Sequence, residues 1–352
     1  NKVNSALDNP TNFFTAQGLN NRASDINNLL DSIGNGVQVL QAANTGITSL
    51  QGLVDTAKSI ANQVLQAPTG YTTKSTSTSS VLAGTAANLV DGTNIKATDV
   101  LDIAATSGGT ATHIVFGASE SLAQLNTALA ANNLTASLDS ANHLVITTTN
   151  DAASSTVTPT FTNTGGGTAT FGAGTAPVAD PASQAIRASL VGQYNNIITQ
   201  ITTTAQDSSF NGTNLLNGDN LKLTFDETGK STLNITGVTF NATGLGLASL
   251  TSGTDFLDNN SANKALTLLS SASTTLRTEA SALGSNLSVV QLRQNFNKSL
   301  IDVLQTGASN LTLADANEEA ANSQALSTRQ SIAVSALSLA NQSQQSVLQL
   351  LR

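Results

Sequence analysis

The chain has 352 residues, of which 14 are Lys or Arg and 22 are Asp or Glu, so its formal net charge is −8. Charged residues are 10% of the chain and aromatic residues 3%, and there is no Cys, Met or Trp. Without Cys, disulfides, thiolate nucleophiles and Cys-ligated metals are excluded. The acidic balance argues against nucleic acid as a partner, and no apolar run approaches the ~20 residues of a membrane span.

Residues 12–66 predict one long helix. Apolar or small side chains recur every three or four residues, which is the spacing of a heptad seam packed against other helices. Several glycines interrupt the segment and lower its intrinsic helical stability, so the helix should depend on its packing partners. The predicted packing positions are Ile26, Leu30, Ile33, Val37, Leu40, Ile47 and Leu50.

Residues 67–182 have a different composition, dominated by Thr, Ser, Gly and Ala. Short apolar-rich segments at 99–103, 113–116 and 143–147 predict strands. Between the last two, residues 120–133 place leucines on one face of a short amphipathic helix. The middle of the chain is therefore predicted to be β-rich, with further strands after this unit.

Helical patterns return after the middle segment. Residues 183–209 predict a helix, and residues 221–240 predict a β-hairpin. The residues predicted to share one face of this helix are Ile186, Leu190, Tyr194, Ile197, Ile201 and Ala205. Residues 244–261 are predicted to be loop. A longer helix follows over 262–308, where leucines repeat every seven residues around one polar interruption, Asn297. Its predicted packing positions are Leu276, Leu283, Leu287 and Val290.

The apolar rows of these predicted helices are longer than the helices of one small globular domain. The predicted fold class is therefore α+β: a long antiparallel helical rod or coiled coil built from both chain ends, with a β-rich outer part inserted in the middle. The last helix, which follows a polar joint at 311–324, is predicted to run to the C-terminus.

Two histidines are candidates for metal chemistry. His113 and His143 both fall on predicted strands of the insert and could neighbour each other across a sheet. One interpretation is that they are polar residues on a solvated strand face. The other is a metal site completed by Glu120 or Asp139. The pattern favours the first.

Carboxylates at the polar joint are the other candidates. Asp315 shares a helical face with Glu318 and Glu319, but no nucleophile accompanies them, so a charged joint is the favoured interpretation. The Gly-rich residues 164–167 lack the Lys-Ser/Thr of a phosphate loop. No catalytic, cofactor-binding or metal-binding residue is predicted, and the chain is not predicted to be an enzyme.

Both ends of the chain resemble bacterial flagellins. Residues 18–51 resemble the first rod-domain helix of that family, including Asn21-Arg22 and Asn44-Thr45-Gly46-Ile47. Residues 184–216 resemble the second rod helix, ending in Phe210-Asn211-Gly212 followed by Leu215-Leu216. Residues 311–352 resemble the flagellin C-terminus, including the final Leu-Leu-Arg.

The resemblance implies a domain order. Residues 1–66 would form the N-terminal rod-domain helix, with the N-terminal core segment missing before it. Residues 67–182 would form the outer insert, of which 99–148 resemble a module found in outer flagellin and hook-associated domains. Residues 183–310 would form the second rod helix, the hairpin and the C-terminal rod helix. Residues 311–352 would form the joint and the C-terminal core helix.

The resemblance also implies a function: a structural subunit that is secreted and polymerises into the extracellular bacterial flagellar filament for swimming motility. Its partners would be copies of itself in a helical homopolymer, the flagellar export apparatus, and filament cap and junction proteins. No cofactor is implied. The residues expected to form the polymerising core coil are Leu326, Ala333, Leu337, Ala340, Val347 and Leu351.

Two alternatives stay open. A flagellin-like cell-surface protein could bind polysaccharide or a host ligand through its insert, which makes surface glycans a further candidate partner. A hook–filament junction protein would share the helical ends. The Leu-Leu-Arg terminus and the Phe210-Asn211-Gly212 motif favour the filament. Without a coiled partner, the helix beyond about Ser323 is expected to be disordered in the isolated chain.

Overall fold

The computed structural model describes the backbone of residues 1–350 and the side chains of residues 1–346. Its helices are α1 (Pro10–Gln66), α2 (Leu122–Ala130), α3 (Pro181–Asp207), α4 (Asn259–Thr312) and α5 (Ala316–Leu350). Its strands are β1 (Tyr71–Thr73), β2 (Thr76–Val81), β3 (Val100–Ile103), β4 (Thr112–Val115), β5 (Leu134–Leu138), β6 (His143–Thr148), β7 (Pro159–Thr162), β8 (Val178–Ala179), β9 (Leu221–Thr224) and β10 (Thr232–Ile235). The predicted mixture of long terminal helices and central sheets is confirmed.

The chain forms two compact units, each built from segments that are far apart in the sequence. Unit 1 comprises residues 1–37, 222–234 and 288–352, and unit 2 comprises residues 38–221 and 235–287. The long helices α1 and α4 contribute residues to both units.

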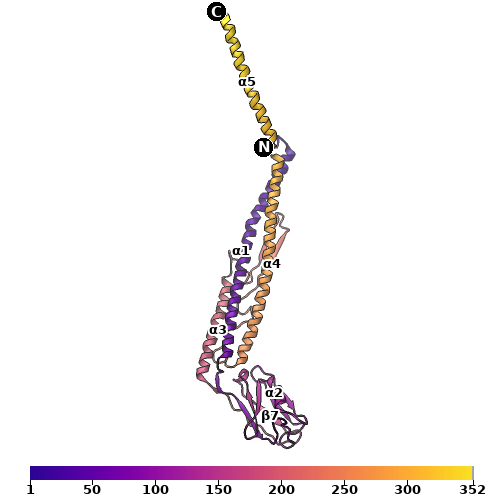
Figure 1. Ribbon diagram of the computed structural model, residues 1–352, viewed down its shortest axis with the longest axis vertical. Helices are drawn as coiled ribbons and strands as arrows, with labels where there is room; N and C mark the ends of the chain where they lie inside the picture. Colours follow the sequence, from indigo (N-terminus) through magenta and orange to yellow (C-terminus); the bar gives the residue numbers. More distant parts are fainter. Residues whose placement is uncertain (351–352) are drawn as a thin grey trace. The chain divides into compact units, whose positions relative to one another are not determined.

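Three helices form the core of unit 2. Figure 1 shows α1, α3 and α4 running alongside one another, with the insert strands grouped at one end of this bundle. The α1 face turned inward carries Leu40, Ile47 and Leu50, all at most 1% exposed. On α4, Leu276 and Leu283 are buried in the same way. Because the apolar rows repeat at three and four residues, each turn of helix adds one buried side chain.

The predicted face of α3 was partly wrong. Leu190 and Ile201 are buried, but Ile186 is 52% exposed, and Ile198 is buried where Ile197 is only half-buried. The helix is rotated so that Arg187, not Ile186, points inward. The predicted inward face of α3 was chosen by hydrophobicity alone. A positively charged residue such as Arg187 could not be included in it, and the face was misplaced for that reason.

Arg187 is fully buried and joins the three helices at the insert end of the bundle. Its guanidinium donates to backbone carbonyls at the end of α1 and before α4, and to one side-chain amide oxygen. The acceptors are Val64 O at 3.1 Å, Ala67 O at 3.0 Å, Pro68 O at 2.6 Å, Phe256 O at 2.6 Å and Asn259 Oδ1 at 3.2 Å. Burial lowers the pKa of Arg187, while the charge of Asp258 opposes that shift. These bonds satisfy carbonyls that the helix ends leave unpaired.

A glycine on α1 allows close packing against the turn that follows α3. A β-carbon at Gly46 would overlap Ser208 Oγ and lie 2.7 Å from Leu216 Cδ1. The turn is fixed by Asn214, whose side chain donates to the carbonyls of Ala205 and Gln206, each at 2.8 Å. The two sequence motifs that carried the family resemblance, around Gly46 and around Phe210, are therefore packed together.

The insert has its own apolar core. Two antiparallel three-stranded sheets, in the orders β2-β6-β5 and β4-β3-β7, enclose it together with α2, which packs on β5. Buried members include Leu101, Leu125, Leu134 and Ile146. The strands predicted over 99–103, 113–116 and 143–147 and the helix within 120–133 are confirmed. β2 and β5 lacked a specific prediction. The Thr- and Ser-rich sequence of β2 carries little apolar signal, whereas the alternating Leu134, Ala136 and Leu138 of β5 were a signal that the sequence analysis did not use.

The two ends of the insert lie side by side. β1 pairs antiparallel with β8, and the Asp180 N–H donates to the Gly70 carbonyl at 2.9 Å. The insert therefore leaves the helical bundle and returns to it at almost the same point.

In unit 1, α1 and α4 pack antiparallel. Ala23 and Ile26 of α1 form a cluster with Ile301 and Leu304 of α4. β9 and β10 form the predicted hairpin, whose sheet pairs them directly. The hairpin is tied to both helices by three contacts: Arg22 Nε with Glu227 Oε1 at 2.6 Å, Asn297 Nδ2 with Phe225 O at 2.9 Å, and the Arg293 guanidinium over the Phe225 ring at 5.8 Å.

One predicted boundary needs correction. α4 begins at Asn259, within the residues predicted to be loop, because Asp258 accepts from Ser261 N at 3.2 Å and so pairs an N–H of the first turn. The predicted last helix is present as α5, from Ala316 to Leu350. The expected disorder of this helix in the isolated chain stays a prediction.

Two glycines of α1 give opposite predictions for the same substitution. Gly46→Ala should destabilise unit 2 because its methyl group would overlap Ser208 and Leu216. Gly52→Ala should stabilise the helix by roughly 0.5–1 kcal/mol, since nothing lies within 4 Å of its β-carbon position. Urea unfolding followed by circular dichroism measures both; equal effects of the two substitutions would contradict the packing.

Replacement of Arg187 should weaken the bundle more than any exposed arginine. Arg187→Ala leaves buried carbonyls without donors, and each unsatisfied group costs about 1–3 kcal/mol, so a total loss of about 3 kcal/mol or more is expected. The exposed Arg277 provides the control, because Arg277→Ala should change stability by less than about 0.5 kcal/mol. Similar unfolding midpoints for the two variants would refute the bracing role of Arg187.

Candidate functional site

The surface of α5 is the strongest candidate site. Every described side chain from Ala316 to Ser346 is exposed, including large apolar ones. Leu326 and Leu337 of the expected core-coil row are 64% and 66% exposed, and Ala333 and Ala340 are exposed beside them. The Val347 side chain and Leu351 lie outside the described residues. Other exposed apolar residues of α5 are Ile332, Val334 and Leu339, at 62%, 62% and 70%.

A short break separates α4 from α5. The N–H groups of Lys2 and Val3 donate to the Thr312 carbonyl at 2.7 and 3.2 Å, which occupies an acceptor at the C-terminus of α4. Asp315 Oδ1 accepts from Asn317 N at 2.8 Å and caps the start of α5. Glu318 and Glu319 follow in the first turn of α5, where negative charge is favourable. These carboxylates act on the helix end, which agrees with the charged-joint interpretation.

The histidines do not share a sheet. His113 lies on β4 and His143 on β6, which belong to different sheets, so the possibility that they neighbour each other across a sheet is excluded. His113 Nδ1 contacts Asp102 Oδ1 at 2.5 Å, and His143 Nδ1 contacts Asp139 Oδ2 at 2.9 Å. The bond from His143 N is the largest cause of the lowered pKa of Asp139. The described part of the chain holds no group of three or more metal-ligating side chains.

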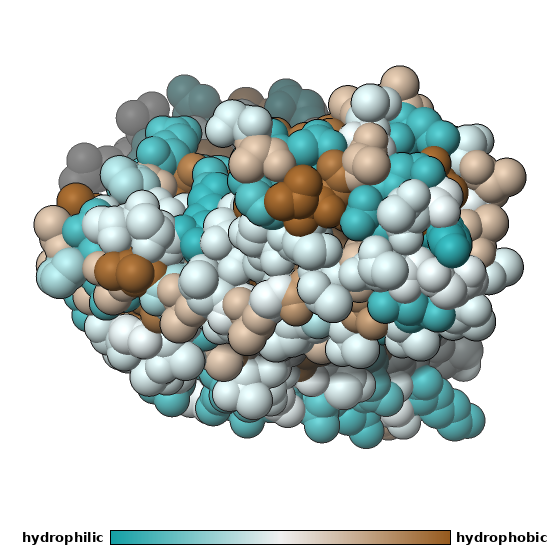
Figure 2. Space-filling model, turned by 90° about the horizontal axis from the view of Figure 1, so that it is seen from below, coloured by the Kyte–Doolittle hydropathy of each residue, from teal (hydrophilic) through white to brown (hydrophobic). Residues whose placement is uncertain are grey.

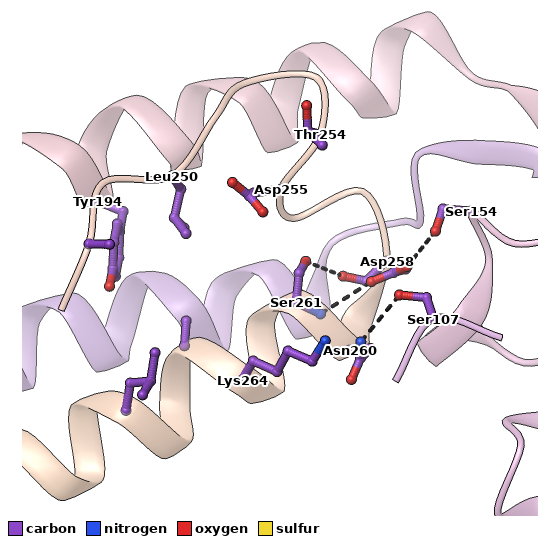
Figure 3. A pocket seen from close by; sticks show the side chains of 13 residues that line it. Ser107, Ser154, Tyr194, Leu250, Thr254, Asp255, Asp258, Asn260, Ser261 and Lys264 are labelled. Carbon is purple, nitrogen blue, oxygen red and sulfur yellow. Dashed lines mark hydrogen bonds between the residues drawn. The ribbon is translucent and has the colours of Figure 1, made fainter. Parts of the chain in front are cut away.

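A cavity of about 320 Å³ lies where the insert meets the helical bundle in unit 2. Figure 3 shows Ser107 and Ser154 of the insert facing Asp258, Asn260 and Ser261 at the start of α4. Ser154 Oγ donates to Asp258 Oδ2 at 2.6 Å, and Asn260 Nδ2 donates to Ser107 Oγ at 3.2 Å. The carboxylate and amide are thus engaged in joining the insert to the bundle.

Tyr194 closes another side of this cavity. It is 1% exposed, packs edge-to-face on Phe256 with ring centroids 5.8 Å apart, and burial raises its pKa to about 12. The Phe256 backbone has a φ of 62°, a strained conformation for a bulky residue. The Phe256 N–H donates a hydrogen bond to Ser261 Oγ, and the Phe256 carbonyl accepts one from Arg187. These two hydrogen bonds hold the residue in this conformation. This wall is built for packing and not for ligand exchange.

The outer surface of the insert is mostly polar. Figure 2 views the molecule from the insert end and shows small, separate hydrophobic areas among polar residues. The aromatic rings of Phe116, Phe161 and Phe171 pack on one another, with centroids 5.8–5.9 Å apart, and contribute to the insert core. They leave no aromatic platform of the kind that commonly binds sugars.

Comparison with known proteins finds a family that resembles the C-terminal helices. Residues 266–351 match the model of the bacterial flagellin C-terminal helical region, a range that includes most of α4 and all of α5. This part of the chain is therefore similar to the C-terminal helical region of bacterial flagellins.

Individual flagellins are similar over about a quarter to a half of the chain. Flagellin FljM of Caulobacter vibrioides is 34% identical over 167 residues, which are 46% of this chain and 59% of that protein. Flagellin A of Rhizobium meliloti is 41% identical over 81 residues, 23% of this chain and 20% of that protein. A flagellin of Brucella melitensis is 28% identical over 171 residues, 46% and 60% of the two chains. The chain thus spans at most about 60% of the length of these flagellins.

Flagellins are a structural protein family, and the observed sites agree with that character. Within the described residues, no helix combines the length and apolarity needed to cross a membrane. The most consequential residue that sequence reasoning missed is Arg187. The available signal was its position: Arg187 lies three residues before Leu190 and therefore on the same side of the helix.

Excision of the insert should leave the helices folded. Because Gly70 and Asp180 are already hydrogen-bonded, replacing residues 71–179 by a two-glycine link closes the gap without moving α1 or α3. The shortened chain should keep cooperative helical unfolding and an unchanged protection of the backbone amides around Val64, whose carbonyl accepts from Arg187. Circular dichroism and hydrogen exchange measure this, and a molten bundle would contradict the modular arrangement.

Proposed function

We propose that this chain is a structural subunit of a bacterial flagellar filament and that it acts by polymerising with copies of itself. The observation that carries this proposal is the exposure of α5, a helix of 35 residues with apolar side chains and no partner among the described residues. The flagellin match over residues 266–351 includes the whole of this helix.

The energetics favour assembly. Burial of a Leu, Ile or Val side chain contributes about 1.5–3 kcal/mol. Leu326, Ile332, Leu337 and Leu339 together therefore offer several kcal/mol that the isolated chain leaves unused. An exposed apolar surface of this extent is otherwise an aggregation hazard, which indicates that it is covered in the functional state. A contact that does not close on itself yields a helical filament instead of a ring.

The remaining expectations form part of the same proposal. The rod domain would comprise residues 1–66 and 183–310, and the outer domain would comprise residues 67–182. Residues 311–352 would form the joint and the core helix. The protein would be secreted through the flagellar export apparatus, act in the extracellular flagellum, and contact cap and junction proteins. The absence of Cys fits passage through an export channel, since no cross-link has to be avoided.

Glycan binding by the insert has less support. The aromatic rings that could stack on a sugar are used in the insert core, and the cavity beside Tyr194 is crossed by bonds that join the insert to α4. Direct binding of an oligosaccharide by the insert would support the glycan-binding alternative.

The proposal predicts that charge on the apolar row of α5 blocks assembly without unfolding the monomer. Leu326→Asp combined with Leu337→Asp should abolish extension of filament seeds, seen by negative-stain microscopy, because two carboxylates would be buried on polymerisation. Both side chains are exposed, so the unfolding midpoint should not change.

The matched control places the same charges on the opposite side of α5, as Gln324→Asp with Gln342→Asp, and should extend seeds. The test uses the chain preceded by a flagellin-type N-terminal segment. Normal filaments from the Leu326/Leu337 variant would reject the assigned row, and no filaments from the unsubstituted protein would reject the proposed function.

A further inference from the structure

Phe256 has a backbone conformation that a bulky residue rarely adopts. Its φ is 62°, and the residue is fully buried. Strain of this kind persists only where the surroundings enforce it, and it is concentrated at positions that change conformation in function. Here the surroundings are two hydrogen bonds: Arg187 Nη1 donates to the Phe256 carbonyl at 2.6 Å, and the Phe256 N–H donates to Ser261 Oγ at 2.7 Å.

The insert bonds to three of the residues that follow Phe256. These bonds run from Gly70 N to the Leu257 carbonyl at 3.2 Å, from Ser154 Oγ to Asp258 Oδ2 at 2.6 Å and from Asn260 Nδ2 to Ser107 Oγ at 3.2 Å. Because the insert and Arg187 of α3 both bond to this stretch, we call residues 256–261 the joint segment.

Asp258 carries the connection from the insert to Phe256. It is 4% exposed, and its other carboxylate oxygen, Oδ1, accepts from Ser261 N at 3.2 Å. Ser261 Oγ also donates to the Asp258 carbonyl at 3.2 Å while it accepts from the Phe256 N–H. A series of hydrogen bonds therefore runs from Ser154 through Asp258, Ser261 and Phe256 to Arg187, and Figure 3 shows the part from Ser154 to Ser261. Buried polar groups bonded in series support one another.

The cavity beside the joint segment offers Asp258 a second position. Removal of the Ser154 hydroxyl would leave a buried carboxylate oxygen without its donor, which is unfavourable. Asp258 lines the cavity of about 320 Å³, which is polar and large enough for water to solvate a carboxylate. A turn of Asp258 into the cavity would break its bond to Ser261, and Ser261 would then no longer hold Phe256.

We infer that the joint segment couples the insert to the helical bundle. Contact with the insert holds Phe256 in its strained conformation, and loss of that contact releases Phe256 and one of the bonds of Arg187. A load that displaces the insert is thereby transmitted to α3. The end of α1 stays bound, because Arg187 also donates to carbonyls there: Val64, Ala67 and Pro68. The coupling acts within one copy of the chain and is independent of polymerisation.

Removal of one insert hydroxyl tests the coupling on the full soluble chain. Ser154→Ala should speed hydrogen exchange of the amides from Phe256 to Ser261 at least tenfold, followed by mass spectrometry, because the segment opens more often. The amides around Val64 should keep their protection. Ser140→Ala, at an exposed position of the insert, is the matched control and should change neither region. Unchanged exchange of the joint segment in Ser154→Ala, or equal acceleration by both substitutions, would overturn the coupling.

A double-mutant cycle tests whether the effect reaches α3. Arg187→Lys keeps the charge but loses the forked guanidinium that donates to several carbonyls. If Ser154 and Arg187 both act through Phe256, their combined effect on the unfolding equilibrium constant should fall at least threefold short of the product of the single effects. A smaller shortfall means that the two residues act independently, and the coupling is then rejected. If Arg187→Lys does not fold, the exchange experiment on Ser154→Ala decides.

Discussion

The apolar face of a heptad-patterned helix must be covered, and this constraint governs the whole molecule. In α1, α3 and α4 the requirement is met within the chain, since rows such as Ile26, Ile47 and Leu276 are buried. In α5 it is not met, although the helix has the same kind of sequence. An isolated helix gains little stability from propensity alone, so its ordered state depends on what it packs against. Under the proposed function, assembly with other copies supplies that partner.

The same constraint explains why the insert is separable. It has its own core of Leu, Ile and Val between two sheets and α2, and its two ends meet at Gly70 and Asp180. The bundle therefore does not rely on the insert for burial. At the boundary, polar groups replace apolar ones: Arg187 bridges helix ends, and Asp258 and Asn260 bond to insert serines. A buried cation satisfied by five acceptors gives this corner one defined geometry.

Periodicity predicted most of the helices, since their apolar rows run over many turns, and the strong short strands of the insert followed from their aliphatic content. Three features were out of reach. Arg187 is buried through hydrogen bonds, which no hydrophobic pattern encodes. β2 pairs with β6 through backbone bonds, and its side chains are mostly small and polar. The histidines were placed on strands correctly, but strand order decides which sheet each joins, and sequence spacing does not fix strand order.

For the candidate site, the sequence pattern identified the apolar positions of α5 but not their exposure, which depends on the absence of a partner. On α4, the seven-residue pattern was a better guide than residue type. Phe296 and Asn297 are adjacent in sequence, yet the apolar ring is exposed and the amide is buried against the Phe225 carbonyl. Residue type alone would have assigned them the other way round, whereas the repeat places Asn297 on the buried row with Val290 and Leu304.

The central claim is that α5 acquires its packing partner from other copies of the chain. Hydrogen–deuterium exchange of residues 316–350, compared between the soluble chain and sedimented polymer, tests this directly. The account predicts rapid exchange of these amides in the soluble chain and strong protection in the polymer, with the amides of α3 protected in both states. Protection of α5 that is equal in the two states would contradict the account, whether the amides exchange slowly in both or rapidly in both.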